Sequence, residues 1–166
     1  MYPGIDFPFN YYSVCPNRKP LPPHQTARVD EVLNMTAGPY YFETMRLPGE
    51  KKAKILAERV VNGPAELFLQ AEQQRIPLAV PVPGAGAMLH TAIPYTNSHF
   101  FLRVNGKLKE VRRDIFERQI STYLEACPEL AQKIARGDKG YHYRNLISIV
   151  TEYNAYLQAQ SASPGN

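Results

Sequence analysis

HFFLRVNGKLKEV, at residues 99–111, is the stretch that decides the fold. Its centre, Asn105-Gly106, supplies the two residues with positive φ that a type I′ turn requires. The stretch therefore predicts a tight antiparallel hairpin.

Helices are predicted directly after this hairpin. Asp114 and Glu117 suit an N-cap and its N3 partner, and the apolar residues Phe116, Ile120, Tyr123 and Leu124 then fall on one helical face. Pro128 suits the first position of a second helix, PELAQKIAR, which Gly137 ends. A third helix is predicted at about 143–159, with one stripe formed by Leu146, Ile149, Val150, Tyr153 and Leu157.

Strands are predicted upstream of the hairpin. AKILAERVV (53–61) and AELFLQA (65–71) flank Asn62-Gly63-Pro64, which favours a second hairpin, although a helix over 50–61 stays open as an alternative. Residues 39–48 are a candidate first strand. The run IPLAVPVP (76–83) carries three prolines, which favours an edge strand or a loop, and 84–98 is predicted to be a loop.

The N-terminal residues have a different composition. Residues 1–48 are rich in Pro, Tyr and Asn, and they predict an extended arm held by aromatic side chains. We expect an α+β fold in which a small antiparallel sheet of four to five strands packs against two or three C-terminal helices. The predicted organisation is the arm (1–48), the α+β domain (49–160) and a disordered tail (161–166).

Composition excludes little. The 166 residues are 44% apolar and 20% charged, with a net charge of +4 and 15 prolines. This is an ordinary globular composition with a mildly basic surface. No apolar run is long enough for a transmembrane helix, and the opening residues MYPGIDFPFNYY lack the pattern of a signal peptide.

Residues that carry chemistry are scattered. The histidines at 24, 90, 99 and 142 have no metal-ligand spacing, and Gly84–Ala87 lacks the remainder of a phosphate-binding loop. Cys15 and Cys127 are a candidate disulfide or two buried thiols. We therefore expect no catalytic residue, no metal and no cofactor, and a protein that is not an enzyme.

Two alternative functions stay open. A small hydrolase or ligand-binding protein would use 84–98 as a lid, together with His90 or His99 and Cys127. A nucleic-acid-binding protein would use the basic hairpin 99–118, which carries Arg103, Lys107, Lys109, Arg112, Arg113 and Arg118.

The order of short motifs from about 55 to 158 resembles a family of uncharacterised envelope proteins of Bacteroidetes-type bacteria. The matching positions are Gly63, Leu67 and Phe68; Leu108; Cys127, Pro128, Glu129 and Leu130; and Ile149, Val150, Tyr153 and Asn154. Family members often carry a second cysteine soon after the final Tyr-Asn pair, where this chain has Ala155 and Tyr156. The resemblance therefore implies that Cys127 is free or pairs with Cys15.

The resemblance implies a location in the periplasm or at the outer membrane, with the cytoplasm as the alternative, and a non-catalytic role. We expect an accessory subunit of a cell-envelope complex whose partner is another protein, with membrane association through that partner and no nucleic acid. Contacts would come from the aromatic arm residues Phe7, Phe9, Tyr11 and Tyr12, and from a sheet edge or a helix face.

Overall fold

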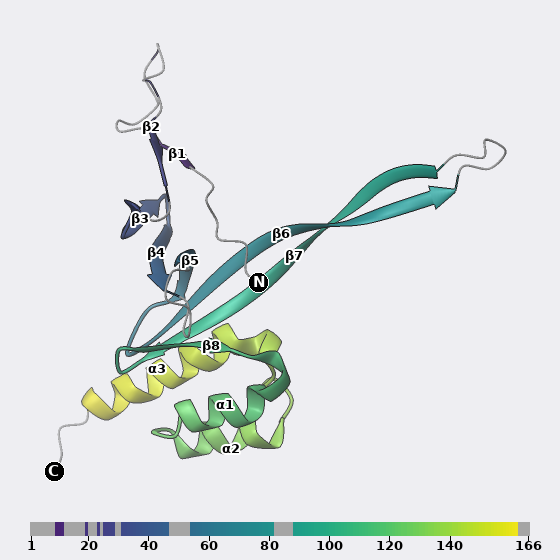
Figure 1. The fold of residues 1–166 in the computed structure, drawn as a ribbon. Coiled ribbons are helices and arrows are strands. Elements are labelled where there is room, and N and C mark those ends of the chain that lie inside the picture. The colour runs from purple at the N-terminus through teal and green to yellow at the C-terminus, as the bar shows by residue number, and fades with distance from the viewer. Residues whose placement is uncertain are drawn as a thin grey trace.

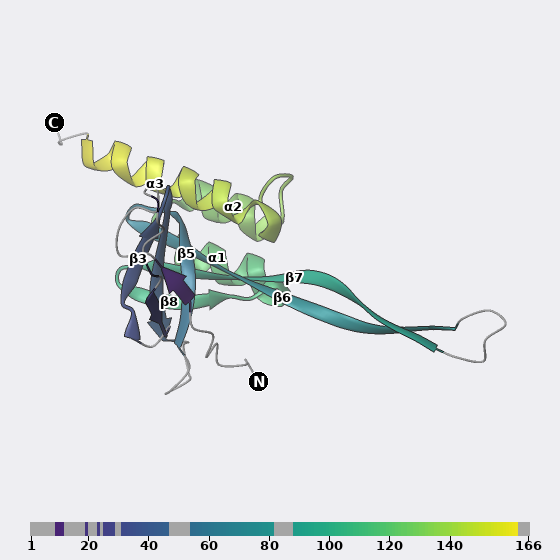
Figure 2. The same cartoon turned by 90° about the horizontal axis from the view of Figure 1, so that it is seen from above.

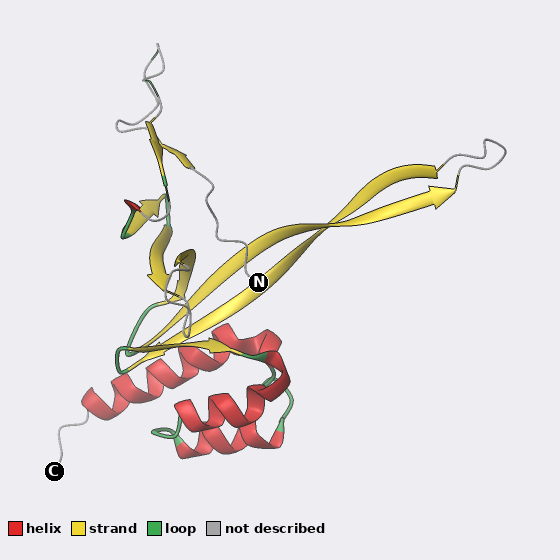
Figure 3. Ribbon diagram, in the orientation of Figure 1, coloured by secondary structure: helices red, strands yellow, loops and turns green. Residues whose placement is uncertain are grey.

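A six-stranded antiparallel sheet and three helices make up an α+β fold (Figures 1 and 3). The computed structural model describes residues 9–11, 19, 23, 25–28, 31–46, 54–81 and 88–162; for 9–11, 72–81 and 88–95 it describes the backbone. The strands of this sheet run in chain order, β3-β4-β5-β6-β7-β8. The predicted fold class is confirmed, with six strands in place of four to five.

The strands of the main sheet are joined as a meander. Their bounds are β3 Asn34–Ala37, β4 Tyr40–Arg46, β5 Lys54–Val61, β6 Ala65–Pro81, β7 Met88–Val104 and β8 Lys107–Val111. A separate two-stranded sheet pairs β1 (Phe9–Tyr11) with β2 (Gln25–Ala27). Since β3 and β4 belong to the main sheet, the sheet begins upstream of residue 49.

Both predicted hairpins are confirmed. Asn105 and Gly106 have φ values of 50° and 73°, the left-handed conformation that a type I′ turn requires. β5 and β6 form the other hairpin, and a bulge between Arg59 and Val61 interrupts their pairing. A bulge adds local twist, and Figure 1 shows β4 and β5 rising steeply from the plane of β6 and β7.

The three helices are α1 (Phe116–Tyr123), α2 (Pro128–Arg136) and α3 (Leu146–Ala162), with 3-10 turns at Arg113–Ile115 and Tyr143–Asn145. Gly137 ends α2 at a φ of 67°, as predicted. The predicted N-cap of α1 is wrong, because Asp114 lies in the 3-10 turn and pairs with Arg112 instead.

The main core lies between these helices and one side of the sheet, which we call the helix face. Its largest fully buried side chains are Leu67, Leu102, Phe116, Ile120, Leu124, Leu130, Ile134, Leu146, Ile149 and Val150. The apolar stripes predicted for the first and third helices lie in this core, with Tyr123 and Leu157 partly buried against it.

Two side-chain amides attach the helices to sheet edges by imitating a strand. Asn154 of α3 accepts a hydrogen bond from the Ala65 N–H and donates one to the Ala65 carbonyl, both at 2.8 Å. Gln119 of α1 donates to the Glu110 carbonyl (2.7 Å) and accepts from the Arg112 N–H (2.9 Å). Backbone groups that would lack a partner at these edges are thereby satisfied.

Gly63 is required where Asn154 approaches the β5–β6 turn. Its φ is 152°, and a Cβ atom at this position would lie 2.6 Å from Asn154 Nδ2. No real Cβ contact is that short. The turn and the amide therefore fit together only because residue 63 has no side chain.

Candidate interaction surfaces

The longest feature of the molecule is the β6–β7 hairpin, whose outer half leaves the sheet. Figures 1 and 2 show it projecting far beyond the helices in two perpendicular views. β5 pairs with β6 only up to Leu69, and β8 pairs with β7 only from Phe100 onward. Residues 70–81 and 88–99 therefore pair only with each other within the described chain, and we call them the ribbon.

The structure corrects the predicted loop at 84–98. Residues 88–98 belong to β7 and pair residue by residue with β6, while 84–87 lie outside the described residues. The proline-rich run is likewise a strand up to Pro81. Neither segment is a lid in this structure.

The prolines of the ribbon occupy one class of pairing position. The two-residue turn makes Val104 and Lys107 a hydrogen-bonded pair, so the odd residues of β7 bond to the even residues of β6. Pro77, Pro81 and Pro94 all fall in the other class, where the backbone nitrogen points away from the partner strand. The prolines therefore remove no backbone hydrogen bond between β6 and β7. Each instead removes one backbone N–H donor from an outer edge of the ribbon.

The ribbon carries no charge along most of its length. From Ile76 to Leu102 the sequence contains no Asp, Glu, Lys or Arg. Apolar residues dominate its outer part, IPLAVP and MLHTAIPY. Apolar surface is favourable to remove from water, and a two-stranded hairpin is at best marginally stable alone.

Charges gather instead at the base of the ribbon, on the side of the sheet opposite the helices. Arg103 donates to Glu43 from two nitrogens, at 2.6 and 3.0 Å, and to Glu66 from Nε at 2.6 Å. Arg59 reaches the second oxygen of Glu66 at 3.0 Å. We call this side of the sheet the ion-pair face.

The ion pairs fix the charge states of their members. Hydrogen bonds to Glu43 and Glu66 raise the pKa of Arg103. Burial raises the pKa of Glu66, but the hydrogen bonds from Arg103 and Arg59 outweigh burial and lower it below its usual value. These shifts favour the charged forms of Arg103 and Glu66, which suits the pair to fixing strand positions and not to proton transfer.

A second buried cluster lies beside these ion pairs. It comprises Met45, Ile55, Ala57, Phe68 and Phe101, and Arg103 stacks over the Phe68 ring at 4.7 Å. The steep turn of β4 and β5 brings Met45 and Ile55 against the two phenylalanines. The base of the hairpin is thus packed on both faces.

His99 is engaged through both ring nitrogens. Its Nε2 lies 3.0 Å from the Asn97 amide nitrogen, and its Nδ1 lies 3.3 Å from a Glu110 oxygen. The amide nitrogen of Asn97 can only donate a hydrogen bond, so Nε2 of His99 accepts it. Nδ1 then carries the ring hydrogen and donates a hydrogen bond to the Glu110 carboxylate. This ring is arranged as a structural link between strands.

Cys127 lies in the main core on the helix face, whereas His99 alternates onto the ion-pair face. The hydrolase hypothesis with this histidine requires His99 and Cys127 to lie together, and the structure does not bring them together. Cys127 is a buried free thiol here, and Cys15 lies outside the described residues. The disulfide between them stays a prediction.

The basic residues of the 99–118 hairpin are divided between different surfaces. Arg103 turns to the ion-pair face, and Arg112 pairs with Asp114 at 2.7 Å. Lys109 lies over the Tyr123 ring at 4.9 Å on the helix face. Arg103 and Lys109 therefore lie on opposite faces of the sheet.

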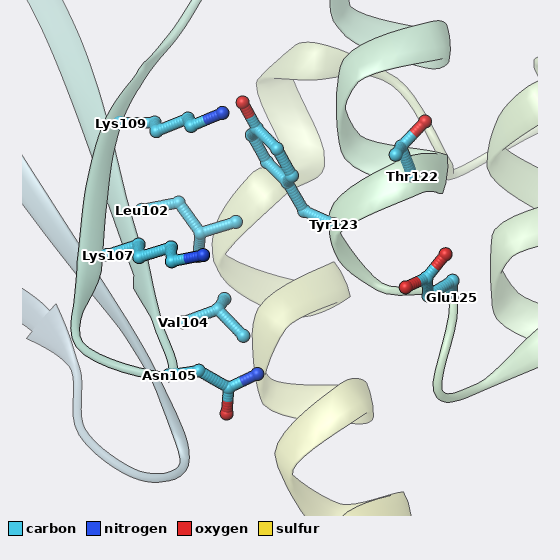
Figure 4. A pocket seen from close by; sticks show the side chains of 8 residues that line it. All are labelled: Leu102, Val104, Asn105, Lys107, Lys109, Thr122, Tyr123 and Glu125. Carbon is cyan, nitrogen blue, oxygen red and sulfur yellow. The ribbon is translucent and has the colours of Figure 1, made fainter.

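A shallow pocket of about 280 Å³ lies between this hairpin and the end of α1 (Figure 4). Its lining combines Lys107 and Lys109 with Glu125, Thr122 and apolar residues. In Figure 4 the Lys109 side chain points at Tyr123, and Glu125 lies on the far wall. The pocket contains no nucleophile beside a base.

Comparison of the chain with family models, curated proteins and solved structures gave no match. Within the described ranges, no group of three His, Cys, Asp or Glu side chains is placed to hold a metal ion. No helix among the described residues is long and apolar enough to cross a membrane.

The predicted arm contacts are mostly beyond what the structure describes. Phe9 and Tyr11 lie in β1, while Phe7 and Tyr12 are outside the described residues, as is His24. Their role in partner binding stays a prediction. The ribbon is the element that sequence reasoning missed, and its signal was the charge-free run from Ile76 to Leu102.

Proposed function

We propose that this protein is a non-enzymatic interaction subunit that docks on a partner protein through the ribbon. The observation that carries the proposal is a paired, charge-free, apolar hairpin extending beyond the sheet and helices. A protruding element of this composition gains free energy when a partner covers it.

A protein is a better partner for the ribbon than the interior of a lipid bilayer. Half of the backbone groups in a two-stranded ribbon point outward, and hydrocarbon offers them no hydrogen-bond partner. A protein surface supplies both apolar contact and polar groups. The outward edges, interrupted at Pro77, Pro81 and Pro94, favour docking by the faces of the ribbon over continuous strand addition.

The setting that we propose is a bacterial cell-envelope complex, in the periplasm or at the outer membrane. This part rests on the resemblance of residues 55–158 to envelope proteins. Aromatic residues of the arm, Phe7, Phe9, Tyr11 and Tyr12, are proposed as a second contact with the partner. Membrane association would then follow from the partner.

Two matched variants of the full chain test the ribbon. Val80 and Leu89 are cross-strand partners in its outer part, so Val80→Glu with Leu89→Lys places opposite charges side by side and keeps the hairpin paired. The control makes the same exchange at Ala71 and Ser98, an exposed pair of the ribbon where it leaves the sheet, next to the base. We call these the tip variant and the base variant.

Each tagged variant is purified from native membranes, and co-purifying proteins are identified by mass spectrometry. We expect the same partner with the wild type and the base variant, and at least a tenfold loss with the tip variant. Equal recovery with the tip variant would contradict the proposal. A chain lacking residues 1–24 tests the arm in the same way.

A further inference from the structure

Two lysines lie on the helix face of β8, at the border of the main core. Lys107 and Lys109 are opposite Val104 and Leu102 in the register of β8 with β7. Residues opposite one another in an antiparallel pair lie on the same face of the sheet, and Leu102 is buried in the main core. The two ammonium groups therefore belong to the side of the sheet that elsewhere buries apolar side chains.

Neither lysine has an ion-pair partner among the residues that the structure describes. Lys109 lies 4.9 Å from the centroid of the Tyr123 ring, which attracts the ammonium group but leaves its charge in place. Both lysines line the pocket beside the end of α1, and Glu125 lies on the far wall (Figure 4). The pocket thus has two positive charges on one wall and one negative charge on the other.

The two positive charges are close to each other. Residues two apart on a strand are separated by ~6.6 Å along it, and in Figure 4 both lysine side chains extend from β8 toward α1. Like charges on one face of a sheet repel each other. An anion between the two ammonium groups would replace this repulsion with two attractions.

The rest of the pocket limits the kind of anion. Its volume of about 280 Å³ is just below the ~300–1,000 Å³ that is typical of small-molecule sites, so its ligand is small. Leu102, Val104 and Tyr123 also line the pocket and favour a ligand with an apolar part. Glu125 on the far wall repels a second negative charge.

We propose that this pocket binds a small organic acid that carries a single carboxylate. The carboxylate lies between Lys107 and Lys109, and each ammonium group donates a charge-assisted hydrogen bond to it. The apolar part of the acid lies against Val104 and Tyr123. This binding site is separate from the ribbon, since it lies at the β7–β8 turn and the ribbon is at the other end of β7.

Protection of the sheet edge is the alternative role of these lysines. β8 is the last strand in the order of the sheet, and inward-facing charges on an edge strand discourage pairing with another molecule. That role needs positive charge at the edge but no ligand. It therefore predicts no saturable binding of an organic acid, and a titration distinguishes the two roles.

The experiment titrates the purified full chain with hexanoate at constant pH and ionic strength, and follows backbone amide shifts by NMR. Hexanamide, which lacks the charge, and inorganic phosphate, which lacks the apolar chain, are titrated in parallel. We expect hexanoate to shift the amides of residues 102–109 and 122–125 in a saturable way. The Kd of each of the other two probes should be at least tenfold higher.

Two double variants, matched in charge, test the lysines. Lys107→Gln with Lys109→Gln should raise the Kd for hexanoate at least tenfold. The control, Arg118→Gln with Lys139→Gln, removes two exposed positive charges outside the pocket and should keep the wild-type Kd. Circular dichroism verifies that each variant is folded. If the lysine double variant aggregates through its edge strand, the two single variants replace it, and each should weaken binding.

Each contrary result overturns a defined part of the proposal. No saturable shift with hexanoate, or an unchanged Kd in the lysine variants, overturns the site. Hexanamide that binds as tightly as hexanoate overturns recognition of the carboxylate, and phosphate that does so overturns the apolar part of the ligand. The tip variant should bind hexanoate like the wild type, so the loss of a co-purifying partner and the loss of this ligand are separate results.

Discussion

The two halves of the β6–β7 hairpin share one backbone register but differ in what covers them. At the base, Leu67 and Leu102 are buried under the helices, and Phe68 and Phe101 are buried on the other face. In the ribbon, no other described strand pairs with either edge. The same local pairing thus serves stability in one half and is available for recognition in the other.

The difference between the base and the ribbon indicates which of them contributes more to the free energy of folding. Burial on both faces is largest at the base, where ion pairs also fix the strand order. A two-stranded hairpin that no other strand joins contributes little by itself. Substitutions at the base should therefore affect unfolding, and substitutions in the ribbon should affect association.

The largest effect is expected for Phe68→Ala at the base. Removal of a fully buried aromatic ring should lower the free energy of unfolding by ~3–5 kcal/mol. In the ribbon, Val80→Ala should change it by less than ~0.5 kcal/mol, because no other described strand pairs with that part of the hairpin. Urea denaturation measures both, and similar losses at the two sites would break the comparison.

The next effect is expected at the amide that attaches α3 to the start of β6. Asn154→Ala leaves the buried N–H and carbonyl of Ala65 without partners, at a cost of ~2–4 kcal/mol. Gly63→Ala should also destabilise the protein, because its Cβ would meet the Asn154 amide. A Tm unchanged within 1–2 °C (about 0.3 kcal/mol) in Asn154→Ala would show that the amide is not needed.

A smaller, pH-dependent effect is expected at Glu66. Its lowered pKa in the folded state means that it stabilises the protein above its unfolded pKa of ~4.3, and that this contribution is lost as the pH falls through the folded value. Denaturation at pH 7 and at about pH 3 should show a shallower loss in Glu66→Gln than in the wild type.

The matched control for Glu66 is Glu117→Gln, which removes an exposed carboxylate of α1. Its loss of stability on acidification should equal that of the wild type. If Glu66→Gln also follows the wild-type curve, the ion-pair cluster does not fix the base of the hairpin.

The smallest effect is expected for Asp114→Asn. Its ion pair with Arg112 is exposed, and such pairs contribute less than ~0.5 kcal/mol in most cases. A loss of ~1 kcal/mol or more would instead indicate the helix cap that the sequence predicted. Thermal unfolding at low and high salt separates the two, since screening weakens only the ion pair.

The sequence predicted the parts of the fold that local chemistry determines. Asn105-Gly106 fixes a turn by its backbone conformation, and Pro128 with Gly137 marks both ends of α2. The loop predicted at 84–98 was wrong over residues 88–98, and the run at 76–83 was left open between an edge strand and a loop, because proline argues against a strand unless the pairing register is known. Pro77, Pro81 and Pro94 are compatible with pairing only because all three fall in one class of position.

The candidate site could not be predicted from the sequence, for the same physical reason. Arg103 and Glu43 meet only once the register from β4 to β7 is fixed. Sixty residues separate them along the chain, so no short-range period brings them together. Pairing between strands that are distant in the sequence decides which side chains meet. The local pattern of a single sequence does not show that pairing.

Hydrogen exchange of backbone amides tests most directly whether the ribbon is covered by another molecule. Exchange is followed at 65–69 and 100–104 in the base, and at 72–81 and 88–97 in the ribbon. In the purified full chain we expect slow exchange in the base and fast exchange in the ribbon; with the co-purified partner bound, both should be slow. Equally slow exchange of the ribbon with and without the partner would contradict the account.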